Sequence, residues 1–219
     1  MNQDVTRRQA AEALVDATIS VAEAGRPLML RVAPEDGQFA VWSHYPPDDS
    51  VDRKSGARWF YHAHPPGERH DGEHGHFHLF FDKTRLDARG ATPVAEPLGG
   101  ASSGADVVHI AAIGISLDGI PTELFTTNRW VTDEWLYAAP EIIAELDDFD
   151  LTAANGDALV NLWLITAVRF FRPEIEAALV ARDQVIASWT DGEQAFEDRD
   201  REVLSQAPID INAAVAALS

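Results

Sequence analysis

The chain has 219 residues, of which 46% are hydrophobic, and its formal net charge is −19. Such an acidic surface repels the phosphates of nucleic acids and of anionic lipid headgroups, so we expect neither nucleic acid nor a membrane as a partner. The sequence contains no cysteine, which excludes disulfides, thiolate-ligated metals and cysteine nucleophiles and leaves imidazole, carboxylate, carbonyl or water as metal ligands.

The N-terminal part predicts a helix followed by two short strands. Residues 4–24 carry apolar side chains at helical spacing, and a glycine and a proline end the pattern. Residues 28–32 and 38–43 are short β-like runs on either side of a turn-forming composition. The proline-rich segment 44–49 is expected to be an extended loop, because the residue before a proline avoids the helical region.

The central part predicts strands and turns. Strands are expected at residues 59–64, 74–81, 107–117 and 120–127. Asp118-Gly119 lies between the last two and is a strong hairpin signal, because these residue types tolerate the positive φ angles of a tight turn. Residues 87–106 are rich in glycine and predict a flexible connection, either a lid or an ordinary surface loop.

The C-terminal part predicts helices. Thr132 is expected to cap a helix, and Pro140 is expected to interrupt the helical segment 133–148. Longer helical segments are expected at residues 156–171, 173–190 and 193–206. The first of these is apolar almost all round, which predicts the most buried helix, and Asp210 is expected to cap a last short helix.

Together these elements predict a single α+β domain over residues 1–219. It would consist of an N-terminal helix in residues 1–27, a mostly antiparallel sheet, open or barrel-like, in residues 28–128, and a helical layer in residues 129–219. No run of about 18 apolar residues predicts a membrane span. The first residues show no signal-peptide pattern, so we expect a cytoplasmic location. The oligomeric state is left open.

Six of the eight histidines lie in one short stretch of the sequence. Five of them form two alternating runs, His62-x-His64 and His74-x-His76-x-His78, and alternation along a strand places the imidazoles of each run on one side. If the two runs pair antiparallel, His62 falls opposite His76 and His64 opposite His74, with Cβ atoms about 4.5–5.5 Å apart. The pattern therefore predicts a metal site with imidazole ligands.

The preferred ligands are His62, His64, His76 and His78, with His74 next and His70 expected in the loop between the runs. Two further histidines could complete the site from neighbouring segments. They are His109, which is otherwise a buried core residue, and His44, which is otherwise a loop residue.

Carboxylates and one arginine are the remaining candidates. Glu68 and Glu73, like Asp71, lie close to the histidines in sequence, and each is either a solvated side chain or a ligand or general base. Arg129, at the end of an expected strand, could anchor an anionic substrate, and the alternative is a helix-end or surface ion pair.

Part of this stretch resembles a known motif. Gly56, His62, His64, Glu68 and Gly75 have the spacing of the first signature motif of the cupin superfamily, over about twenty residues. In cupins the two histidines and the glutamate bind the metal, so the resemblance implies a metal site that includes Glu68. The second cupin motif has no counterpart downstream.

A second resemblance covers most of the chain. The phrases YHAH, EHGHFHLFF, LDGIP and TTNRWVTDEW resemble an uncharacterised bacterial family of unknown function. This resemblance implies one coherent domain.

The leading hypothesis is a metal-dependent enzyme with a mononuclear His-rich site, oxygenase-like or hydrolytic, that binds Fe(II) or Zn and acts on a small-molecule substrate. The alternatives are a non-catalytic metal- or small-molecule-binding protein, such as a sensor, and a structural role for the histidines. The sequence motifs of zincins, di-iron bundles and serine hydrolases are not present.

Overall fold

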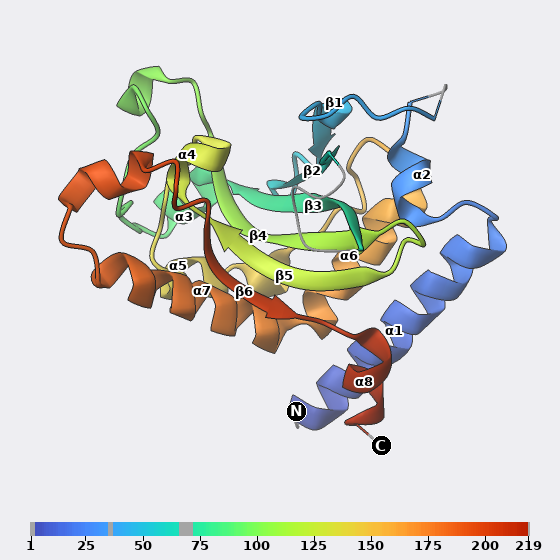
Figure 1. Cartoon of the computed structure of the whole chain (residues 1–219). Helices are drawn as coiled ribbons and strands as arrows, with labels where there is room; N and C mark the ends of the chain where they lie inside the picture. Colours follow the sequence, from blue (N-terminus) through green and yellow to red (C-terminus); the bar gives the residue numbers. More distant parts are fainter. Residues whose placement is uncertain (1–2, 35–36, 66–71, 219) are drawn as a thin grey trace.

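An antiparallel sheet lies at the centre of the protein. The computed structural model describes residues 3–34, 37–65 and 72–218. In these residues the sheet has six strands that follow one another in chain order (Figure 1). The strands are β1 (Tyr45–Val51), β2 (Ala57–Ala63), β3 (Glu73–Asp82), β4 (Val107–Ser116), β5 (Pro121–Thr127) and β6 (Val203–Pro208). The α+β class is confirmed, whereas the barrel-like alternative is wrong because β1 and β6 are the two edges of an open sheet.

Helices flank the sheet. The α-helices are α1 (Gln3–Glu23), α2 (Leu28–Val32), α3 (Lys83–Ala88), α4 (Arg129–Thr132), α5 (Ala139–Ile143), α6 (Ala158–Phe170), α7 (Arg172–Ala187) and α8 (Ile211–Ala216). The 3-10 helices are η1 (Gly100–Ser102), η2 (Leu146–Asp148) and η3 (Gly192–Glu197). Figure 1 shows α5, α6 and α7 on one side of the sheet and α4 on the other, with α1 and α8 together near the two termini.

The helical side of the sheet carries the hydrophobic core. Helix α7 packs on β4, β5 and β6, and α1 packs on α6. The indole of Trp59 in β2 donates a hydrogen bond of 2.8 Å to Asn161 in α6, which ties the helical layer to the sheet. The strand residues that face this side are buried. They include Trp59, Tyr61, Phe77, Leu79, Phe81, Ala111 and Ile113. As expected from its composition, α6 is buried along most of its length.

Two short apolar runs do not form the expected strands. Residues 28–32 form α2, which starts after Pro27 and buries Leu28 and Met29 against the core. Residues 38–43 are irregular, with a turn at Val41 and Trp42. A run of five residues is too short to distinguish a strand from a helical turn by its pattern alone. Most of the proline-rich segment expected as a loop is β1, an edge strand, where missing N–H donors are tolerated.

The C-terminal part also differs from expectation in two places. Helix α4 is capped by Asn128, whose side chain accepts a hydrogen bond from the Arg129 N–H, and Thr132 is its last residue. Residues 193–206, expected to be helical, contain η3 and the start of β6, which pairs with β5. The hairpin at Asp118-Gly119 is present, and Asp210 caps α8 by accepting a hydrogen bond from the Ala213 N–H.

Candidate metal centre

Three buried imidazoles meet on the face of the sheet opposite the core. His62 in β2 is paired with His76 in β3, and His78 lies two residues further along β3, so all three point to the same face. The exposed fractions of these residues are 8%, 2% and 1%. One ring nitrogen from each lies within 4.8 Å of the others. These three residues could therefore hold a metal ion.

Small residues in β4 leave room for this cluster. Gly114 is paired with His76 and Ala112 with His78. The ring of Phe125 in β5, which is paired with Ala112, makes an edge contact with the His76 ring at a centroid distance of 4.8 Å. A Cβ atom at Gly114 would come within 3.0 Å of the Glu123 side chain, so the glycine also makes space for buried carboxylates beside the imidazoles.

A buried glutamate contacts the outer nitrogen of His76. Oε1 of Glu73 lies 2.7 Å from Nδ1 of His76, and the Glu73 side chain is fully buried. On the other side of the ring, Nε2 of His76 lies 3.0 Å from Nε2 of His78. A carboxylate that accepts from Nδ1–H fixes the tautomer that leaves Nε2 available to a metal ion. Of the predicted carboxylates, Glu73 therefore lies at the cluster.

His109 contacts His78 from behind. Its Nε2 lies 3.0 Å from Nδ1 of His78, and its Nδ1 lies 3.2 Å from Oγ1 of Thr127. A hydrogen-bond chain from His78 through His109 to Thr127 would hold the His78 ring with its Nε2 towards His76. The two ring nitrogens of His109 thus face Thr127 and the outer nitrogen of His78, and His109 does not add a nitrogen to the three that converge.

For His78 and His109, burial favours the neutral form of the imidazole, which is the form that binds metals. Burial, followed by the charges of the neighbouring histidines, holds the pKa of His78 well below its ordinary value. Burial and then the charge of Arg182 lower the pKa of His109 to about 3.

Glu134 contacts the main chain of His109, and the sequence pattern did not identify it as a candidate site residue. Its carboxylate accepts a hydrogen bond from the backbone N–H of His109. Burial raises the pKa of Glu134 to about 7, and the charge of Arg182 opposes that rise.

His64 and His44 lie at the edge of the cluster. Nε2 of His64 is 3.0 Å from Nε2 of His62, and the ring of His64 also contacts Trp42. His44 stacks on the ring of Phe60 at a centroid distance of 3.6 Å, and its Nδ1 lies 3.0 Å from a carboxylate oxygen of Asp49. His64 is therefore close enough to join the three buried histidines after a side-chain movement, whereas His44 is held by other partners.

His74 does not lie with His76 and His78, although the alternating run places them together. The pairing of β3 with β4 shifts between Glu73 and Gly75, which is a β-bulge with His74 as the extra residue. Nδ1 of His74 lies 2.6 Å from the hydroxyl of Tyr61, and its ring packs against Phe39. The bulge brings Glu73 to the imidazoles and directs His74 to the core side.

The remaining predicted residues are either outside the described part of the chain or away from the cluster. Glu68, with His70 and Asp71, lies outside the described residues. The guanidinium of Arg129 pairs with Glu197, and its Nη1 lies 3.5 Å from Asp133. Arg129 lines a different cavity, of about 780 Å³, between residues 92–100 and η3. Its contacts match the ion-pair alternative rather than an anchor for a substrate at the histidines.

A cavity of about 230 Å³ opens beside His62 and His78. Its walls come from the segment before β1, from β2 and β3, from α4 and from the residue before β6. The lining residues are Trp42, His44, Phe60, His62, His78, Trp130, Val131, Thr132 and Glu202. The histidines of this set were predicted from the sequence, whereas the α4 residues and Glu202 carry no local signal, because they reach the imidazole face only through the fold.

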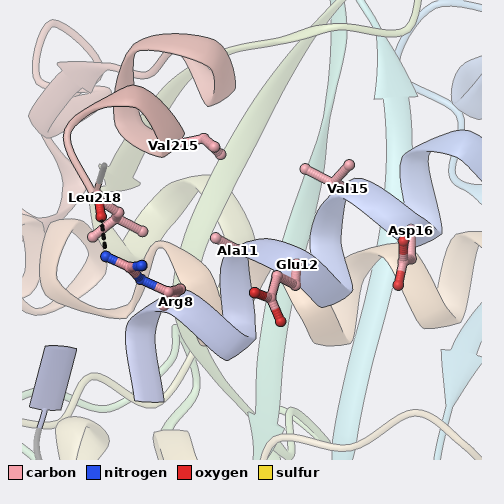
Figure 2. Close-up of a pocket in the computed structure, with 7 residues that line it drawn as sticks. All are labelled: Arg8, Ala11, Glu12, Val15, Asp16, Val215 and Leu218. Atoms are coloured by element: carbon pink, nitrogen blue, oxygen red, sulfur yellow. Dashed lines mark hydrogen bonds between the residues drawn. The ribbon is translucent and has the colours of Figure 1, made fainter. Parts of the chain in front are cut away.

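A further cavity, of about 290 Å³, lies between α1 and α8. Figure 2 shows Arg8 bonded to the carbonyl oxygen of Leu218 at one end of an opening bordered by Ala11 and Val215. This cavity contains no histidine and lies away from the imidazole face.

The fold and this site define an α+β protein with an open antiparallel sheet and three buried imidazoles that could bind a metal. The chain belongs to the family described as a domain of unknown function (DUF6969), whose model matches residues 8–209. This agrees with the predicted resemblance to a family of unknown function. No curated protein and no solved structure matches the chain. The likeness to cupins stays confined to one motif, because the single open sheet differs from the two-sheet jelly roll of cupins.

None of the helices in the described part of the chain has both the length and the apolar character required to cross a bilayer.

Proposed function

We propose that the protein is a metal-dependent enzyme with a mononuclear centre held by His62, His76 and His78. The observation that carries this proposal is the convergence of three buried ring nitrogens within 4.8 Å of one another. Neutral imidazole nitrogens that converge from neighbouring strands are a common ligand set for transition metals in proteins.

The surroundings of the centre support a catalytic role. Three protein ligands are the number used by catalytic zinc sites, which leave a coordination position for water or substrate. His62 and His78 both line the 230 Å³ cavity, so a molecule in that cavity would lie next to the centre. The metal would supply Lewis-acid activation of water or of a substrate oxygen, or oxygen chemistry if it is iron.

The donor set favours Fe(II) or Zn. Neutral imidazole suits both ions, and the lack of cysteine removes the thiolates that direct other sites to softer metals. Glu73 would hold the ring of His76, and His109 would hold the ring of His78. Each contacts Nδ1 of its histidine, which leaves Nε2 of that ring for the metal.

A non-catalytic metal carrier or sensor is the second candidate. The observation in its favour is the 3.0 Å separation between Nε2 of His64 and Nε2 of His62. If His64 joins the other three, the shell has four imidazoles and is closed, as in structural sites.

Substitution with Co(II) followed by azide titration distinguishes the two roles. An open position predicts that azide changes the visible absorption spectrum of the Co(II) protein with a saturable 1:1 dependence. A spectrum that azide does not alter would favour the carrier. If Co(II), Zn and Fe(II) all fail to bind the wild-type protein, both roles are excluded. The variant His74→Gln is the matched control, because it removes an imidazole that lies on the other side of the sheet.

A further inference from the structure

The cavity beside the imidazoles has aromatic walls drawn from three separate segments. Trp42 precedes β1, Phe60 lies in β2 and Trp130 lies in α4. The Trp42 ring contacts the His62 and His64 rings at centroid distances of 5.8 and 4.6 Å. The Phe60 ring lies 4.9 Å from the His78 ring. A flat ring placed between these walls would stack on or meet the edge of at least one of them.

Trp42 is held in an unusual way for a large apolar residue. It is 55% exposed, and its backbone has a φ of 66°, in the left-handed region that costs a residue with a side chain about 1 kcal/mol or more. Strained residues of this kind occur at ligand clamps and active sites. The position of Trp42 at the cavity beside the candidate ligands fits that use.

The size of the cavity restricts its occupant to a single ring. An apolar cavity of roughly 150 Å³ holds a benzene molecule. The volume of about 230 Å³ therefore accommodates one ring with one or two small substituents.

The charge of the lining disfavours an anion. Among the described lining residues, Glu202 is the one carboxylate, and the set contains neither lysine nor arginine. The guanidinium of Arg199 lies over the Trp130 ring, 4.3 Å from its centroid, but Arg199 is not one of the lining residues. The chain as a whole carries a net charge of −19, which adds to the repulsion of an anionic molecule.

One wall also carries polar ring nitrogens. His62 and His78 both line the cavity, and an imidazole can donate or accept a hydrogen bond. A hydroxyl group on an occupant could therefore hydrogen-bond to this wall.

We infer that this cavity binds a single-ring aromatic compound that carries a hydroxyl group and no negative charge, such as a simple phenol. That this compound is the substrate of the metal centre rests on the proposed function, whereas its binding in the cavity does not. The hydroxyl group would face His62 and His78.

The test measures binding of three probes of similar size to chelator-treated protein by ligand-observed NMR. The probes are phenol, benzoate and cyclohexanol. We expect phenol to bind at a single site at least 10-fold more tightly than benzoate and more tightly than cyclohexanol. The variant Trp42→Leu should weaken phenol binding about 5-fold or more, because it removes an aromatic wall, and Trp42→Phe should retain most of the affinity. Because Trp42 is exposed, neither replacement disturbs the core.

Metal titration of the same samples keeps the two claims apart. If phenol fails to bind at millimolar concentration, or benzoate binds as tightly, the inference is overturned even if zinc binds. Equal binding of phenol and cyclohexanol, or a Trp42→Leu variant with unchanged phenol affinity, also overturns it. If phenol binds as expected but no metal does, the cavity assignment stands and the proposed metal-dependent enzyme falls.

Discussion

Replacement of Glu73 by glutamine should weaken metal binding through His76. The carboxylate lies 2.7 Å from Nδ1 of His76 and is fully buried, so it acts on the imidazole without competition from water. Glutamine keeps the shape and an oxygen acceptor, and it removes the negative charge that strengthens the imidazole as a ligand.

The expected magnitude follows from the role of such outer partners. Mutation of a group that hydrogen-bonds a ligating histidine costs about 10- to 100-fold in metal affinity. At about 1.4 kcal/mol per tenfold, this corresponds to about 1.4–2.8 kcal/mol. We expect Glu73→Gln near the lower limit, because one hydrogen bond remains, and Glu73→Ala near the upper limit.

The assay is the zinc dissociation constant, measured by competition with a chelator at pH 7. Glu145→Gln is the matched control, since Glu145 is an equally buried glutamate that pairs with Arg85 and Arg89 in another part of the protein. It should lower stability and leave zinc affinity unchanged.

A double-mutant cycle makes the test specific. In the His76→Ala background, Glu73→Gln should have no further effect on zinc affinity, because its route to the metal has been removed. The reasoning is refuted by a Glu73→Gln protein with wild-type zinc affinity, or by an effect that persists undiminished without His76.

Three further predictions concern the frame of the site. In Gly75→Ala, the new Cβ would collide with the carbonyl oxygen of His62 and lie 2.6 Å from the Tyr61 hydroxyl, so urea denaturation should show a loss of about 3 kcal/mol or more; an unchanged midpoint would contradict the close packing of β2 on β3. Asp157→Ala removes the cap of α6 and should cost about 1–2 kcal/mol in the same assay, whereas wild-type stability would show that the cap is dispensable. The pKa of Glu134 in the folded protein, about 7, exceeds the ordinary value of 4.5. Between these pH values the folded protein retains a proton that the unfolded chain has released. The contribution of Glu134 to the free energy of unfolding therefore falls as pH rises. The difference in unfolding free energy between wild type and Glu134→Gln should therefore become less favourable to the wild type from pH 5 to pH 7.5, and a constant difference would count against the raised pKa.

The sequence predicted the paired strands of the site because their pattern is local and strong. Alternating histidines on two neighbouring runs predict His62 opposite His76, and the structure has this pair. The same pattern places the imidazoles on one face and aromatic residues such as Phe77 and Phe81 on the core face.

Two β-bulges decide the membership of the cluster, and strict alternation does not reveal them. A bulge at His74 moves it from the imidazole face and brings Glu73 there instead. The second bulge is in β4. Leu79 and Phe80 of β3 are paired with Ala111 and His109 of β4, so Ile110 is an extra residue and His109 joins the imidazole face. Each extra residue inverts the face of the side chains beyond it, which is why prediction by alternation fails beyond a bulge.

The walls of the cavity depend on contacts between segments that are distant in sequence. Strand β6 was expected as a helix, because its charged surroundings resemble an amphipathic pattern, yet it pairs with β5 from more than 75 residues away. Glu202, just before β6, and Trp130, in α4, reach the cavity through this arrangement. The sequence pattern connected neither residue with the histidines, so these walls of the cavity could be identified only from the structure.

The metal content of protein purified without an affinity tag tests the central claim most directly. We predict about one equivalent of iron or zinc per chain in the wild type and in His74→Gln, and a loss of most of it in the triple variant with alanine at His62, His76 and His78, because buried imidazole sites bind such ions tightly. Circular dichroism of the triple variant would establish that the fold persists. A wild-type protein with less than about 0.2 equivalents of any transition metal and no uptake on titration with zinc or Fe(II) would contradict the claim.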